Sequence, residues 1–135
     1  MYRRVSFVAV TIFALSFAGA ARAQQPADAA GKWAGTWNDT GTGHHGPLHA
    51  KIVRVDDCTY HATFHGRFRK VVPFIYALDL RVAGRDGDHV ILTGSLKMPL
   101  TGQVMELTAR VSACDFDADF CSEKYRGKFE LTRTR

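Results

Sequence analysis

Apolar and polar residues alternate along most of this chain, while apolar residues at helical spacing are missing. Residues two apart face the same side of a β-strand, so each alternating run gives a strand with one apolar face. The runs predict seven strands, over 32–38, 48–55, 59–68, 72–83, 89–98, 103–113 and 124–132. Residues 115–120 also alternate, and two interpretations stay open for them: an eighth strand, which would allow antiparallel closure, or a loop.

A short pattern recurs five times: an apolar residue, any residue, glycine, any residue and a second apolar residue. Its copies are 33–37, 64–68, 92–96, 100–104 and 125–129. Each copy places a glycine on the apolar face of its strand, where glycine usually marks a bend or the close approach of another backbone. We therefore predict an all-β fold, an antiparallel up-and-down meander of seven or eight strands that closes as a small barrel.

The N-terminal residues have the features of a secretion signal. Arg3 and Arg4 give a cationic start, an apolar run follows over 5–18, and Ala-Arg-Ala at 21–23 has the form of a cleavage site. The apolar run is too short to cross a bilayer comfortably. We expect the mature protein to be secreted or periplasmic, with no integral membrane segment.

Cleavage defines the domain organisation that we predict. Residues 1–23 form the cleaved signal peptide, 24–30 a flexible lead-in, and 31–135 a single β-barrel domain. Loss of the three arginines in the signal lowers the balance from 18 basic against 13 acidic residues to 15 against 13, a net charge of +2. A nucleic-acid-binding domain is usually strongly basic, so we expect no nucleic-acid partner, and we expect a monomer.

Three cysteines, Cys58, Cys114 and Cys121, would lie in an oxidising compartment. One disulfide and one free thiol is the simplest arrangement. We expect a Cys114–Cys121 disulfide, which requires residues 115–120 to form a loop. An extended strand there would separate the two cysteines by about 20 Å, beyond bridging distance.

The chain resembles two groups of known proteins. Gly31-Lys32-Trp33 on the first strand, followed by a meander and a basic last strand, resembles the calycin superfamily of lipocalins, fatty-acid-binding proteins and avidins. That resemblance is architectural and implies the barrel. The stretches 43–48, 64–68, 73–76 and 115–117 are also similar to a group of secreted bacterial proteins of uncharacterised activity. Neither resemblance implies a catalytic residue.

The histidines fall into two groups. His49, His61 and His65 point outward by strand parity, beside arginine and lysine, and are typical of a solvated polar face. His44 and His45 lie in the glycine-rich loop 39–46, which can fold over one end of the barrel. Nearby cations disfavour a bound divalent ion on the outer face, so we expect no metal and no cofactor.

The inward positions are almost wholly apolar, which argues against acid–base catalysis and favours binding of a small molecule. A second interpretation is that the inward rings simply fill a narrow barrel. The candidate ligand-binding residues are Trp33, Trp37, Tyr60, Phe64, Phe74 and Tyr76 in the interior, with His44, His45, Arg69 and Lys70 at the rim. A cationic rim over an apolar interior suits a small apolar or amphipathic anionic ligand.

We therefore interpret the protein as a secreted β-barrel binding module and not as an enzyme. Two alternatives from other classes remain open. One is a metal-dependent or redox enzyme that uses His44, His45 and Cys58. The other is a protein-binding module, such as an inhibitor of an extracellular hydrolase, that presents its outer histidines and arginines.

Overall fold

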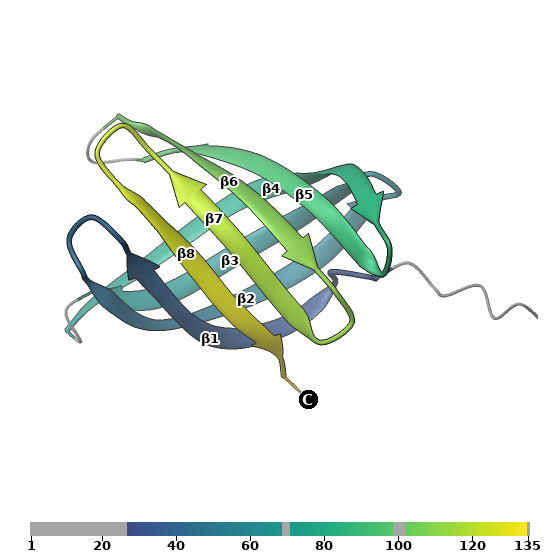
Figure 1. Ribbon diagram of the computed structural model, residues 1–135, viewed down its shortest axis with the longest axis horizontal. Coiled ribbons are helices and arrows are strands. Elements are labelled where there is room, and N and C mark those ends of the chain that lie inside the picture. The colour runs from purple at the N-terminus through teal and green to yellow at the C-terminus, as the bar shows by residue number, and fades with distance from the viewer. Residues whose placement is uncertain (1–26, 69–70, 99–101, 135) are drawn as a thin grey trace, which may run out of the picture.

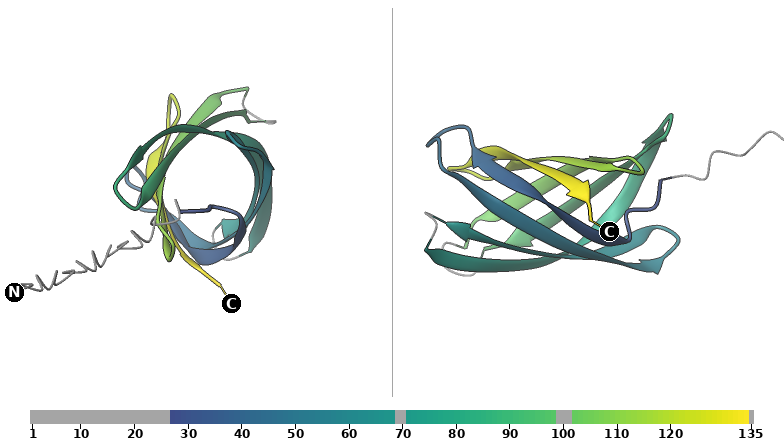
Figure 2. Two further views of the ribbon diagram at one scale, coloured as in Figure 1. Left: turned by 90° about the vertical axis from the view of Figure 1, so that its right-hand side faces the viewer. Right: turned by 90° about the horizontal axis from the view of Figure 1, so that it is seen from below.

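Eight antiparallel strands, all within the described residues, follow one another around a closed barrel, and the last strand pairs with the first (Figure 1; Figure 2). This computed structural model describes residues 27–68, 71–98 and 102–134. The strands are β1 (Gly31–Asp39), β2 (His45–Asp56), β3 (Thr59–Phe68), β4 (Val72–Asp86), β5 (His89–Lys97), β6 (Val104–Val111), β7 (Asp115–Cys121) and β8 (Arg126–Arg133). The predicted meander barrel is confirmed. Residues 115–121 form a strand, β7, which brings the number of strands from seven to eight.

Burial along the strands follows the predicted alternation. In β6 every second residue is buried, from Met105 to Val111, and in β7 the same period places Phe116 and Phe120 inside. Ala113 and Tyr125 differ from the predicted pattern, because both lie beyond the ends of their strands and are exposed. Within the described ranges, no helix has the length and apolar character that a membrane crossing needs.

Two inward glycines allow the first and last strands to close the barrel. A Cβ on Gly35 would lie 1.9 Å from the carbonyl oxygen of Glu130, and a Cβ on Gly127 would lie 1.9 Å from that of Asn38. Both contacts join β1 and β8, so the backbones approach too closely for any side chain there. Gly102, from the copy of the glycine pattern at 100–104, lies between β5 and β6 and has a φ of 67°. This glycine therefore belongs to a turn and not to the inward face of a strand.

The barrel has two different ends. The closed end carries the β2–β3, β4–β5 and β6–β7 turns, both chain termini of the barrel and the short segment 27–30. The open end carries the β1–β2, β3–β4, β5–β6 and β7–β8 connections. The termini of the barrel lie together because an even number of antiparallel strands brings the chain back to the end where it began (Figure 1).

Residues 27–30 plug the closed end and are not a flexible lead-in. Ala29 is completely buried, and its carbonyl accepts a hydrogen bond from Trp33 Nε1 at 3.0 Å. Arg133 Nη1 donates to the carbonyl of Ala30 at 2.7 Å, and its Nη2 donates to the carbonyl of Asp28. The segment lies across one end of the ring of strands (Figure 2, left). Small side chains and satisfied carbonyls therefore fix it, while the predicted signal peptide and residues 24–26 lie outside the described residues.

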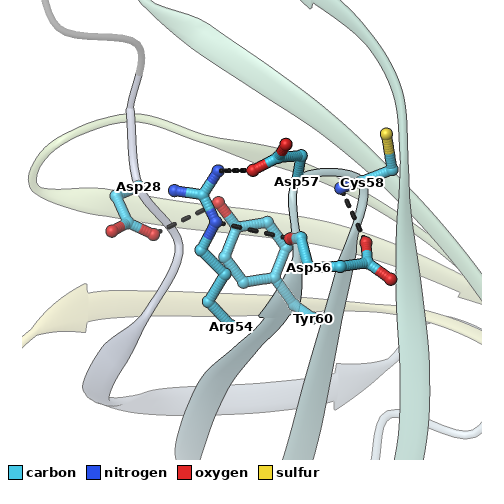
Figure 3. A network of polar contacts seen from close by, with 6 residues as sticks. All are labelled: Asp28, Arg54, Asp56, Asp57, Cys58 and Tyr60. Carbon is cyan, nitrogen blue, oxygen red and sulfur yellow. Dashed lines mark hydrogen bonds and ion pairs between the residues drawn. The ribbon is translucent and has the colours of Figure 1, made fainter.

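Polar contacts lie beside the plug, at Tyr60 and the β2–β3 turn (Figure 3). The Tyr60 hydroxyl donates to Asp28 Oδ1 at 3.1 Å, and burial together with that carboxylate raises the pKa of the phenol. At the adjacent β2–β3 turn, Asp56 Oδ1 accepts the backbone N–H of Cys58 at 2.8 Å, and this bond holds the pKa of the Asp56 carboxyl below its ordinary value.

The prediction of a Cys114–Cys121 disulfide is wrong. Residues 115–121 form the extended strand β7, so Cys114 lies at the closed end and Cys121 at the open end. A strand of that length separates its ends by about 20 Å, which no disulfide can span. Cys58, Cys114 and Cys121 are all free and exposed.

Candidate functional site

The interior at the open end is hollow. A cavity of about 670 Å³ opens there, within the volume range of small-molecule sites. Its described lining is mainly aromatic and aliphatic. The lining residues are Trp37, Asp39, Thr42, His44, Phe68, Phe74, Ile75, Tyr76, Met98, Met105, Phe120, Ser122, Tyr125 and Phe129.

The other half of the interior is filled by side chains. The Trp33 and Phe116 ring centroids are 5.7 Å apart, and those of Phe64 and Phe116 are 6.1 Å apart. Trp33, Phe64 and Tyr60 are each at most 3% exposed, and none of them lines the cavity. These three predicted ligand residues are therefore packed core. Large inward rings and the plug 27–30 occupy the volume at this end.

One wall of the cavity is a stack of aromatic rings from β1, β3 and β4. Trp37 stacks on Phe68 with centroids 6.0 Å apart and meets the edge of Phe74 at 5.9 Å. Phe74 in turn lies 5.3 Å from Tyr76, whose pKa burial raises. Trp37 Nε1 donates to the carbonyl of Arg67 at 3.3 Å, which fixes the indole. Trp37, Phe74 and Tyr76 thus lie where the sequence predicts ligand-binding residues.

The rest of the described wall comes from β6, β7 and β8, the last of which pairs with β1, and it contains residues that the sequence analysis did not select. Phe120 and Phe129 pack with centroids 5.1 Å apart, and Met105 is 6% exposed beside them in the lining. All three are inward by strand parity. The sequence pattern does not show that these residues lie near the open end, because their depth in the barrel depends on where each strand begins and ends.

A carboxylate belongs to the lining of this mainly apolar site. Asp39 is the last residue of β1, continues its inward face after Trp37, and is only 6% exposed. Its Oδ1 accepts the backbone N–H of Gly41 at 2.9 Å. The hairpin closes where the N–H of Asp39 donates to the carbonyl of His44 at 2.7 Å, so the loop is shorter than the predicted 39–46 and β2 begins at His45.

Of the four residues predicted for the cationic rim, the described part of the chain contains His44 and His45. His44 lines the cavity, with its ring centroid 5.1 Å from that of Phe68. His45 is exposed outside the lining, with Nδ1 3.3 Å from the carbonyl oxygen of Gly43. Arg69 and Lys70 lie outside the described residues. An anionic ligand therefore stays a prediction, and the carboxylate of Asp39 acts against it.

The structure separates the three residues of the enzyme alternative. His44 and His45 lie at the open end, whereas Cys58 follows β2 at the closed end, after roughly 36 Å of strand. The three residues therefore cannot act at one site. In the described part of the chain, no three His, Cys, Asp or Glu side chains are grouped so as to hold a metal ion.

The outer histidines lie on the solvent side of β2 and β3. His49 and His65 stack with centroids 5.1 Å apart, and His61 Nδ1 lies 2.8 Å from Asp79 Oδ1. They face away from the cavity, as strand parity predicts. A protein-binding role for this face stays a prediction.

Comparison with known proteins identifies the fold. No protein-family model matches the chain, and no curated protein matches it. Among solved structures, it is similar to a redesigned β-barrel, mFAP1, bound to DFHBI, with a TM-score of 0.60 and 11% sequence identity over 78% of this chain and 94% of the other. It is also similar to a de novo designed fluorescence-activating β-barrel, with a TM-score of 0.57 and 16% identity over 78% and 93% of the two chains. At these identities the likeness shows a small antiparallel β-barrel fold.

Proposed function

We propose that this protein is a secreted, non-catalytic module that binds a small, largely apolar molecule inside its barrel. The observation that carries the proposal is the cavity of about 670 Å³, which is open at one end and sealed by residues 27–30 at the other. Side chains that line an empty cavity lose the packing contacts that they would have in a filled core, and this loss lowers the stability of the protein. An open, mainly apolar cavity of this size therefore favours a bound molecule.

The lining indicates the shape of that molecule. Flat rings from Trp37, Phe68, Phe74 and Tyr76 form one part of the wall, and Phe120 and Phe129 continue it on β7 and β8. Aromatic walls favour a flat ring system, which stacks between them with little loss of conformational freedom. The likeness to a designed barrel that holds DFHBI supports a barrel of this size as a container for a molecule of that kind.

Two tryptophans provide the test, because Trp37 lines the cavity and Trp33 lies in the packed core. Bromobenzene is a neutral aromatic probe whose heavy atom quenches tryptophan only at contact. We expect saturable quenching of the protein, unchanged in Trp33→Phe and lost in Trp37→Phe. Equal quenching in both variants, or quenching that never saturates, would show that the cavity does not hold the probe.

Secretion and the absence of catalysis belong to the same proposal. N-terminal sequencing of the exported protein should begin at Gln24, and a mature chain that still carries residues 1–23 would contradict secretion by cleavage. The described lining holds one carboxylate and one imidazole among mainly apolar groups, which is poor ground for acid–base chemistry. A bound ligand should therefore be recovered chemically unchanged.

A further inference from the structure

Asp39 is the only side chain with a formal negative charge among the described residues that line the cavity, and no described lysine or arginine lines it. At 6% exposure it is nearly as buried as the rings around it. A buried carboxylate is costly unless a partner compensates its charge. We propose that the bound molecule carries a positively charged nitrogen on a flat apolar skeleton, and that this nitrogen lies against Asp39. This inference rests on the proposed binding function.

The rings beside Asp39 suit the same group. Trp37 precedes Asp39 by two residues on the same face of β1, and Phe129 pairs with Trp37 on the neighbouring strand β8. Aromatic faces attract cations through their quadrupoles, most strongly where water is excluded. A carboxylate together with aromatic faces therefore recognises an organic cation, while an anion would meet the negative charge of Asp39.

The turn at the end of β1 explains the presence of an aspartate, but it does not explain why the aspartate is buried. Asp56 makes the same local bond at the end of β2, where its Oδ1 accepts the N–H of Cys58 at 2.8 Å, two residues ahead. Asp56 is exposed at the closed end, far from the cavity. The two turns thus contain the same kind of hydrogen bond, and of the two aspartates only Asp39 lines the cavity.

This pair of aspartates gives a matched experiment. Asn keeps the oxygen that accepts the backbone N–H and removes the charge. Asp39→Asn and Asp56→Asn therefore make the same chemical change in the same kind of turn, one at each end of the barrel. Each protein is titrated with three fluorescent dyes: cationic thioflavin T, neutral Nile red and anionic anilinonaphthalene sulfonate. If Asp39→Asn does not fold by circular dichroism, Asp39→Ser replaces it, because a serine hydroxyl can accept the same N–H.

We expect Asp39→Asn to weaken thioflavin T binding about tenfold, the usual effect of losing a contact to a charged partner. Nile red affinity should change less than twofold, anilinonaphthalene sulfonate should bind the variant more tightly, and Asp56→Asn should match the wild type with all three dyes. Equal thioflavin T affinity in wild type and Asp39→Asn overturns the inference, as does tighter binding of the anion than of the cation by the wild type. Failure of Nile red to bind would instead overturn the proposed function itself.

Discussion

Replacing Arg133 with alanine should detach the plug from the closed end of the barrel. The guanidinium makes three hydrogen bonds to backbone carbonyls, of Asp28, Ala30 and Ala113, the last at 2.8 Å from Nε. It also lies over the Trp33 indole, with Cζ 4.3 Å from the ring centroid. One side chain therefore joins the plug, the β6–β7 turn and the core.

The size of the effect follows from these contacts. A hydrogen bond at a partly exposed site contributes about 1 kcal/mol net, and a half-buried cation over a buried indole ring contributes about 1 kcal/mol. Because Ala removes all four contacts, Arg133→Ala should lower the free energy of unfolding by about 4 kcal/mol, which corresponds to roughly 16 °C in Tm for a domain of this size. Arg133→Lys keeps the charge without the planar fork of donors, so its loss should be intermediate.

Urea unfolding followed by far-ultraviolet circular dichroism measures the loss. Arg110→Ala is the control, because Arg110 makes one exposed ion pair, with Nη1 2.9 Å from Asp86 Oδ2. Exposed pairs contribute about 0.5 kcal/mol. Acrylamide quenching gives a local readout, since Trp33 is 1% exposed beneath the plug and should become accessible only in Arg133→Ala.

The reasoning is refuted if Arg133→Ala costs no more stability than Arg110→Ala. It is also refuted if Trp33 stays protected from acrylamide in Arg133→Ala, because the remaining contacts of the plug would then hold it without Arg133.

Three further predictions concern other parts of the barrel. Gly127→Ala should destabilise the fold by about 3 kcal/mol or prevent folding, since its Cβ would lie 1.9 Å from a backbone oxygen. The control Gly84→Ala should be nearly neutral in urea unfolding, because its Cβ meets no described atom within 4 Å. Peptide mapping without reduction should recover Cys114 and Cys121 as separate free thiols, and a peptide that joins them would contradict the strand between them. The raised pKa of Tyr60 means that the unfolded chain loses this proton first, so stability should fall as pH rises through about 10, and Tyr60→Phe should reduce that slope.

The strand pattern shows how much of the fold follows from local sequence. Along a strand, every second side chain faces inward, so the alternation of apolar and polar residues shows the inward face. This can be read from one strand without knowing which strands lie beside it. It therefore correctly placed Trp37, Phe74 and Tyr76 inside the barrel. The glycines at 35 and 127 were also recognisable, because a small residue on an apolar face already indicates a close backbone approach.

The site was only half predictable from the same pattern. Trp33 and Phe64 have the same parity as Trp37, yet they fill the core while Trp37 lines the cavity. Parity gives the direction of a side chain and not its depth along the barrel. Asp39 was missed because the sequence alone suggested a loop from that residue on, whereas the structure extends β1 through it and turns it inward.

The sequence by itself determined the class of fold, the inward face of most strand residues and the glycines where another backbone approaches closely. Tertiary structure decided that 115–121 is a strand, that Cys114 and Cys121 lie at opposite ends, and that 27–30 seals one end so that the hollow volume remains at the other. The physical reason is that strand direction and burial come from neighbouring residues, while depth, closure and the cavity come from register between strands far apart in the chain.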